Sequence, residues 1–289
     1  MKLTFRIGMG PDRVIRGDFY ACQNDARAIV VVCHGFKGFK DWGMFPYAAE
    51  RLSRHMHVVT FNFSHNGVGE DLLEFTELEK FAVNTYSREL EDLDKVVSLV
   101  HSGRLPLSGD TSSVGDYAHL PMILLGHSRG GAVSMIYALD NPDLVHGMIG
   151  WNGSMNTDIF SEEDKHKMRT EGRAYTVNAR TKQRMPLDRV ILEDLEQNRS
   201  RFDILGRAHT LQVPAVLIQG SEDIERIKQN SAKFVERNPR VKRVMVEGAN
   251  HTFQAVHPFQ GTTPQLEEAI RLTEQYALQF AGVRDSMEH

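Results

Sequence analysis

The feature that most constrains the fold of this chain is an apolar run that leads straight into a glycine-rich turn. Residues 122–125 are typical of a buried strand, and Gly126-His127-Ser128-Arg129-Gly130 follows directly, ahead of a helical pattern. In a Gly-x-Ser-x-Gly turn the serine hydroxyl is lifted above the sheet, and the glycines let the backbone turn without side-chain clashes. The pentapeptide alone also fits an ordinary glycine-rich turn. The role of Ser128 therefore depends on what the rest of the chain supplies.

Apolar strand-like runs alternate with helical patterns along most of the sequence. This alternation predicts an α/β fold with a mostly parallel central sheet and helices on both faces, preceded by an antiparallel hairpin at residues 3–8 and 14–21. Residues 105–120, rich in glycine and serine, predict a surface loop. Strands are expected at 28–33, 57–63, 122–125, 145–151, 214–219 and 241–246, and helices at 44–54, 77–100, 132–139, 224–237 and 264–280.

Residues 152–210 interrupt this alternation. They are polar, with helical patterns at 162–170 and 187–198, and they contain few runs that could join a sheet core. We expect them to form an insertion in a single core domain made of residues 1–151 and 211–289.

Composition excludes several classes of function. The formal net charge of −4 over 289 residues gives no basic face for nucleic acid. No apolar run approaches the roughly 18 residues of a membrane span, and the N-terminus does not resemble a signal peptide. Cys22 and Cys33 are too few for a metal framework and argue against an oxidising compartment. A cytoplasmic protein without metal, cofactor, nucleic-acid or membrane partner is expected.

A serine hydroxyl becomes a useful nucleophile only beside a base that an acid orients. Both residue types follow predicted strands, in the chain order serine, acid, histidine. His251 lies in a glycine-containing loop after the strand at 241–246, and Glu222 and Asp223 follow the strand at 214–219. Asp158, after an earlier strand, is a more distant candidate for the acid.

The reaction also needs hydrogen-bond donors for the oxyanion that forms when the serine attacks a carbonyl. One is expected to be the backbone N–H of Arg129, at the positive end of its helix. The second should come from the loop after the first buried strand, His34-Gly35-Phe36. The glycine allows the backbone to turn inward, which favours the N–H of Phe36.

Together these motifs resemble the α/β-hydrolase superfamily, and within it small bacterial serine carboxylesterases of the cinnamoyl/feruloyl-esterase and dienelactone-hydrolase-like kind. The resemblance covers about residues 14–281. It implies a triad of Ser128, His251 and Asp223, because Asp223 stands at the distance from Gly220 seen in similar sequences. It also implies that residues 152–210 form a cap over the substrate pocket. Dienelactone hydrolases proper use a cysteine nucleophile, so a serine here points towards esters.

Arg129 departs from the methionine or small residue common after the serine in such esterases. Its side chain could contact a substrate carboxylate, but a surface ion pair is the preferred interpretation. Four apolar residues are candidates for the pocket or equally for core packing: Trp42, Trp151, Met155 and Phe160.

We expect a cofactor-independent hydrolase of small-molecule carboxylic esters, aromatic esters among them. A thioesterase or peptidase of the same fold is the alternative within the enzyme class, since fold and triad do not fix the leaving group. A non-catalytic receptor on a hydrolase fold and a metal hydrolase are further alternatives. The metal hydrolase rests on His34, His55, His57 and His65 in the N-terminal half, but His55 and His57 lie at the start of a predicted strand with no carboxylate at ligand-like spacing.

Overall fold

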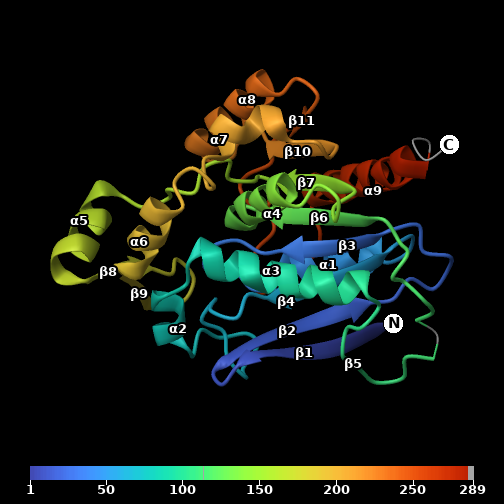
Figure 1. Cartoon of the computed structure of the whole chain (residues 1–289), viewed down its shortest axis with the longest axis horizontal. Helices are drawn as coiled ribbons and strands as arrows, with labels where there is room; N and C mark the ends of the chain where they lie inside the picture. The colour runs from blue at the N-terminus through green and yellow to red at the C-terminus, as the bar shows by residue number, and fades with distance from the viewer. Residues whose placement is uncertain (113, 286–289) are drawn as a thin grey trace.

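The computed structural model describes residues 1–112 and 114–285, and within them the predicted α/β fold is confirmed. One sheet has the strand order β11-β10-β7-β6-β3-β4-β2-β1-β5 (Figure 1). Its strands are β1 (Lys2–Gly10), β2 (Arg13–Tyr20), β3 (Ile29–Cys33), β4 (His57–Asn62), β5 (Leu107–Ser108), β6 (Met122–His127), β7 (Gly147–Trp151), β10 (Ala215–Gly220) and β11 (Lys242–Val246). From β4 to β11 neighbouring strands are parallel, whereas β2, β1 and β5 pair antiparallel.

Helices cover both faces of this sheet, as the apolar strand runs require. The faces carry two hydrophobic clusters, one including residues of α3 (Tyr86–His101), α4 (Arg129–Asp140) and α8 (Glu225–Arg237). The other includes residues of α1 (Met44–Leu52) and α9 (Pro264–Asp285). Every residue of β3, β4, β6, β7 and β10 is buried, as expected of strands covered on both sides. No described helix is both long and apolar enough to cross a membrane.

The helix expected at residues 77–100 is wrong in its first part. The chain forms two helices, α2 (Leu78–Ala82) and α3, separated by residues 83–85. Thr85 is the N-cap of α3. Its backbone is extended, and its side-chain oxygen accepts a hydrogen bond from the N–H of Arg88 in the first turn. The apolar period that predicted the helix belongs to α3 alone.

Residues 152–210 contain a hairpin that the sequence analysis did not predict. They form α5 (Glu162–Glu171), β8 (Arg173–Val177), β9 (Arg184–Asp188), α6 (Val190–Gln197), α7 (Ile204–Arg207) and the short helix η1 (Ala208–Thr210). The strands β8 and β9 pair with each other, apart from the main sheet. The helix expected from Leu187 therefore begins at Val190, because Leu187 is part of β9.

The β8–β9 hairpin rests on the core through a third hydrophobic cluster. Met185 and Leu187 of the hairpin share this cluster with Phe75 and Phe81, from the stretch around α2. The side-chain amide of Gln183 donates to the carbonyl of Phe75 at 3.0 Å. Figure 1 shows α2, α5, α6 and the hairpin grouped at one end of the sheet.

The loop expected at residues 105–120 is not entirely at the surface. It contributes the edge strand β5 to the sheet, antiparallel to β1. Leu105, Val114 and Tyr117 are buried in the core. These apolar side chains hold the segment against the core. Their spacing is too irregular to predict a helix or a strand from the sequence.

Arg129, the first residue of α4, makes a buried ion pair with Glu89 of α3. Its Nε lies 2.7 Å from Oε2 of Glu89, and the two side chains are only 2% and 4% exposed. The guanidinium also lies 3.8 Å from the ring centre of Tyr86, and Asn84 donates to the second carboxylate oxygen of Glu89. The expectation of a surface ion pair is therefore wrong, because α3 covers the arginine completely.

Glu89→Ala should lower the free energy of unfolding by about 3–5 kcal/mol, because it leaves a buried guanidinium without its counter-charge. Glu91→Ala is the matched control on the same helix, since Glu91 is 59% exposed where it pairs with Arg13. This control should cost less than about 1 kcal/mol. Urea denaturation followed by circular dichroism measures the free energy of unfolding of both variants. Equal losses of stability in the two variants would contradict a larger contribution from the buried ion pair.

Candidate active site

Ser128 occupies the turn between β6 and α4 in a backbone conformation that is rare for residues with a side chain. Its φ is 54° and its ψ is −120°, a strained combination that costs of order 1–3 kcal/mol. A Cβ atom on Gly126 would lie 2.4 Å from the carbonyl oxygen of Gly130, and one on Gly130 would lie 2.2 Å from that of Cys33. An ordinary turn would place a glycine at the strained position. Here the glycines fill crowded positions and a serine carries the strain.

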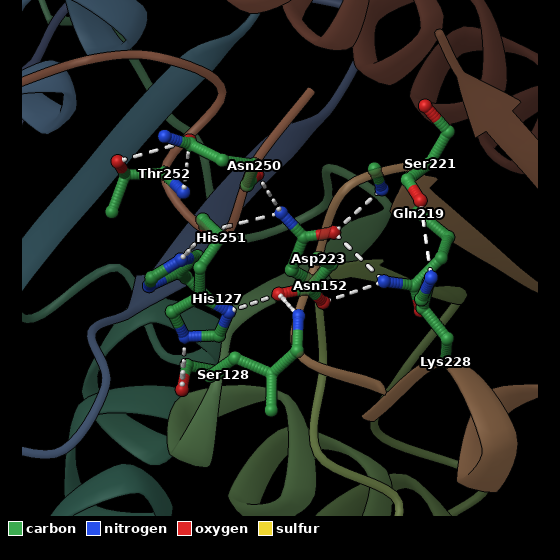
Figure 2. A network of polar contacts seen from close by, with 12 residues as sticks. His127, Ser128, Asn152, Gln219, Ser221, Asp223, Lys228, Asn250, His251 and Thr252 are labelled. Carbon is green, nitrogen blue, oxygen red and sulfur yellow. Dashed lines mark hydrogen bonds and ion pairs between the residues drawn. The ribbon is translucent and has the colours of Figure 1, made fainter. Parts of the chain in front are cut away.

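The structure brings His251 and Asp223 together with Ser128 (Figure 2). Nε2 of His251 lies 2.9 Å from Oγ of Ser128, and Nδ1 lies 2.6 Å from Oδ1 of Asp223. Because a carboxylate only accepts hydrogen bonds, Nδ1 carries a proton, and a neutral ring then presents the lone pair of Nε2 to the serine. The arrangement can take a proton from the serine hydroxyl.

The rival acids lie elsewhere. Glu222 is exposed, and its backbone N–H donates to the carbonyl of Ala249. Asp158 forms an ion pair with Lys165 at 2.6 Å. Only Asp223, with a fully buried side chain, faces His251.

Two buried amides that sequence reasoning missed hold the acid and the base in place. The amide of Gln219 donates to Oδ2 of Asp223 at 2.6 Å and to Oδ1 of Asn152 at 3.0 Å. Asn152 in turn donates to the carbonyls of Asn250 and His251, both at 3.0 Å, and accepts from the N–H of Gly220 (Figure 2). The sequence indicates them only by their position, because each stands at the carboxyl end of a core strand.

Two further histidines support the loops beside the serine. Nε2 of His127 donates to the carbonyl of His251 at 2.8 Å, and burial lowers the pKa of His127 to about 3. Nδ1 of His34 donates to the carbonyl of Gly35 and its Nε2 accepts from the N–H of Phe63, while burial lowers its pKa to about 4. Both rings are therefore neutral near pH 7. Backbone groups contact both nitrogens of His34 and Nε2 of His127.

The histidines named for a metal site do not assemble into one. His57 uses Nδ1 to accept from the N–H of Cys22, and His55 faces Glu274 at the surface. Across residues 1–112 and 114–285, no three His, Cys, Asp or Glu side chains are placed to share an ion.

The loop after β3 lies directly against the serine. A Cβ atom on Gly35 would stand 2.9 Å from Cβ of Ser128 and 3.4 Å from its Oγ, so a side chain there would displace the nucleophile. Neither Phe36 nor Arg129 donates its backbone N–H to another group in the described part of the chain. Arg129 is the first residue of α4, where backbone N–H groups lack helical partners and favour negative charge.

A cavity of about 310 Å³ opens on Ser128 and His251. Trp42 lines it, together with Phe36 and Phe45. The other three pocket candidates do not: Trp151 donates its ring N–H to Thr273 in the core, and Met155 and Phe160 are buried in hydrophobic clusters. The cavity is lined by Gly35, Phe36, Lys37, Gly38, Trp42, Phe45, His127, Ser128, Asn178, Ala179, Arg180, His251 and Thr252.

Comparison with known proteins agrees with this geometry. A family model described as "Putative esterase" matches residues 108–272, and one described as "Serine aminopeptidase, S33" matches residues 24–160. Monoglyceride lipase from Rattus norvegicus is 29% identical over 123 residues, which are 43% of this chain and 34% of that protein. The match therefore spans about a third of the length of the rat lipase.

Solved structures with the same fold extend over nearly the whole chain. A putative hydrolase from Agrobacterium vitis S4 aligns with a TM-score of 0.68 at 18% identity, over 96% of this chain and 98% of its own. Est1E from Butyrivibrio proteoclasticus aligns with a TM-score of 0.68 at 15% identity, over 96% and 99%. More than half of the chain is matched by the putative-esterase family model, and its fold is shared by these structures. The chain therefore belongs to the α/β-hydrolase superfamily.

Proposed function

We propose that this protein is a serine hydrolase of carboxylic esters. The observation that carries the proposal is the unbroken series of contacts from Asp223 through His251 to Ser128, which ends at an open cavity. A non-catalytic receptor on the same fold would not need the base and the acid at hydrogen-bonding distance. The geometry therefore favours an enzyme.

In the proposed mechanism, Nε2 of His251 takes the proton of the Ser128 hydroxyl as Oγ attacks the ester carbonyl carbon. The buried carboxylate of Asp223 stabilises the imidazolium that results. The oxyanion accepts hydrogen bonds from the N–H groups of Phe36 and Arg129. When the tetrahedral intermediate collapses, the C–O bond to the alcohol breaks, the alcohol takes the proton from His251, and an acyl-enzyme remains. Water then attacks the acyl carbon by the same sequence of steps and frees the acid.

The segment between β7 and β10 is proposed as a cap that selects substrates. Residues 178–180, at the turn of the β8–β9 hairpin, line the cavity beside Ser128. Asn152 belongs to the amide network, and the N–H of Ser154 donates to the carbonyl of Ser128. We therefore propose that the cap begins after residue 154 and extends to residue 210.

The leaving group separates the ester hypothesis from a thioesterase or a peptidase. The monoglyceride lipase relatives and a structure of Est1E with bound ferulic acid favour oxygen esters, whereas the aminopeptidase family description favours amides. A turnover screen over aryl, short-chain alkyl and hydroxycinnamate esters, with thioesters and aminoacyl amides beside them, decides between these alternatives. Faster turnover of thioesters or amides than of every oxygen ester would overturn the proposal.

Ser128→Ala and His251→Ala should each reduce ester turnover by several orders of magnitude without loss of folded structure, since each removes a member of the triad. A fluorophosphonate should label the native wild-type protein on Ser128. The same reagent should leave Ser128→Ala and heat-denatured wild-type protein unlabelled. Absence of an adduct on native protein, or more than about a tenth of wild-type turnover in His251→Ala, would contradict the assignment.

Gln219→Met should lower kcat by about ten- to a hundred-fold with KM nearly unchanged, because a loosened Asp223 misorients His251 without touching the substrate. The rate of fluorophosphonate labelling should fall in parallel. Gln229→Met, on the exposed side of α8, is the matched control and should change neither. If Gln219→Met lowered stability but left kcat and the labelling rate intact, the amide would have only a structural role.

A further inference from the structure

The cavity at Ser128 carries an imbalance of charge. Lys37, from the loop after β3, and Arg180, from the turn of the β8–β9 hairpin, both line it. No aspartate or glutamate is among the described residues that line it. This excess of positive charge occurs in a chain whose formal net charge is −4. The two cations come from elements far apart in the sequence and meet at the one cavity that contains the candidate nucleophile.

Lys37 is the cation whose charge is least compensated. Its Nζ donates to the backbone carbonyl of Val177 at 3.1 Å and lies 5.6 Å from the ring centre of Phe36. Within the described residues no carboxylate forms an ion pair with it, and burial lowers the pKa of its ammonium group. An ammonium that loses water without gaining a counter-ion is destabilised, and a bound anion would relieve that cost.

Arg180 has a weak partner. The nearest carboxylate oxygen, on Glu74, lies 3.9 Å from Nη1, and both side chains are partly exposed, at 30% and 51%. Pairs of this kind contribute little to stability. Asp41, an acid next to the cavity residue Trp42, is already engaged by Lys40 at 2.6 Å. The planar guanidinium of Arg180 therefore remains available for bidentate binding of a carboxylate.

We infer that the substrate is an ester that carries a second, ionised group, a carboxylate, which Lys37 and Arg180 bind while Phe36, Trp42 and Phe45 contact its apolar part. This inference rests on the proposed function and narrows its substrate class. A monoanion suits the site, because Glu74 already offsets part of the charge of Arg180. Arg129 does not make this contact, because its guanidinium is buried in an ion pair with Glu89 of α3 and does not line the cavity.

The test compares esters that differ only in this charge. Mono-4-nitrophenyl adipate places a carboxylate on the acyl side, and methyl 4-nitrophenyl adipate is its neutral counterpart. The pair 3-acetoxybenzoate and methyl 3-acetoxybenzoate places the charge on the alcohol side. The wild-type protein should show about a ten-fold higher kcat/KM for the anionic member of at least one pair, the order expected of a charged hydrogen bond. Equal kcat/KM within both pairs would overturn the inference.

Variants assign the preference to the two cations. Lys37→Met and Arg180→Met should each reduce the ratio of anionic to neutral kcat/KM towards one. Lys182→Met removes a charge from the same hairpin but outside the cavity lining, and it should leave the ratio unchanged. If Lys182→Met lowered the ratio as much as Lys37→Met does, the preference would come from the general field of the hairpin, and the assigned contacts would be wrong.

A binding measurement separates this inference from the proposed function. Ser128→Ala should bind mono-4-nitrophenyl adipate more tightly than its methyl ester in isothermal titration calorimetry, and Lys37→Met in the same background should reduce the difference. Failure of the wild-type protein to hydrolyse any ester, with the binding difference intact, would reject the esterase and retain the anion site. Hydrolysis of both esters without a difference in kcat/KM or in binding would reject the anion site alone.

Discussion

The geometry of the site depends on one buried side-chain amide, that of Asn152. It follows β7 with a φ of 45° and is fully buried. Its hydrogen bonds reach the last residue of β10, where one loop begins, and the loop that follows β11. These loops supply Asp223 and His251. Leaving a buried amide without hydrogen-bond partners costs about 1–3 kcal/mol. Each loop is therefore held in the position in which its backbone can form hydrogen bonds with the Asn152 side chain. The relative position of Asp223 and His251 is therefore fixed by the fold, and the proposed mechanism depends on such preorganisation.

The proposed nucleophile, Ser128, is held by different means. Ser128 takes its strained conformation because its N–H donates to the carbonyl of Trp151 and its own carbonyl accepts from Ser154. The close approach of Gly130 to β3 leaves no room for the turn to relax. The strain is thus balanced by backbone contacts to neighbouring strands, and the serine hydroxyl stays within reach of His251.

Sequence patterns predicted the parts of this structure that follow from local chemistry. The apolar runs gave the core strands, and loops at the ends of those strands predicted Ser128, Asp223 and His251, which the structure brings within hydrogen-bonding distance. Asn152 escaped prediction because its partner Asn250 lies 98 residues away in the sequence. Gln219 stands only four residues before Asp223, but its other contact, with Asn152, spans 67 residues, and a glutamine at the end of an apolar strand does not by itself indicate this network. The β8–β9 hairpin escaped because its strands pair only with each other and lack the continuous buried apolar run that marks the core strands.

Two cations near the site differ in role because they differ in burial and in their partners. Arg129 contributes one of the two backbone N–H groups proposed to bind the oxyanion, and Lys37 follows Phe36, which contributes the other. The sequence around neither residue indicates whether its charge has a counter-ion. Arg129 is enclosed with Glu89, so its charge is neutralised inside the protein and serves to join α3 to α4. Among the described residues, Lys37 contacts a backbone carbonyl and forms no ion pair with a carboxylate, which is why we propose that its charge binds a substrate anion. A buried cation that is paired with a carboxylate of the same protein has a structural role. A cation that lines a cavity without such a carboxylate is a candidate for binding an anionic ligand.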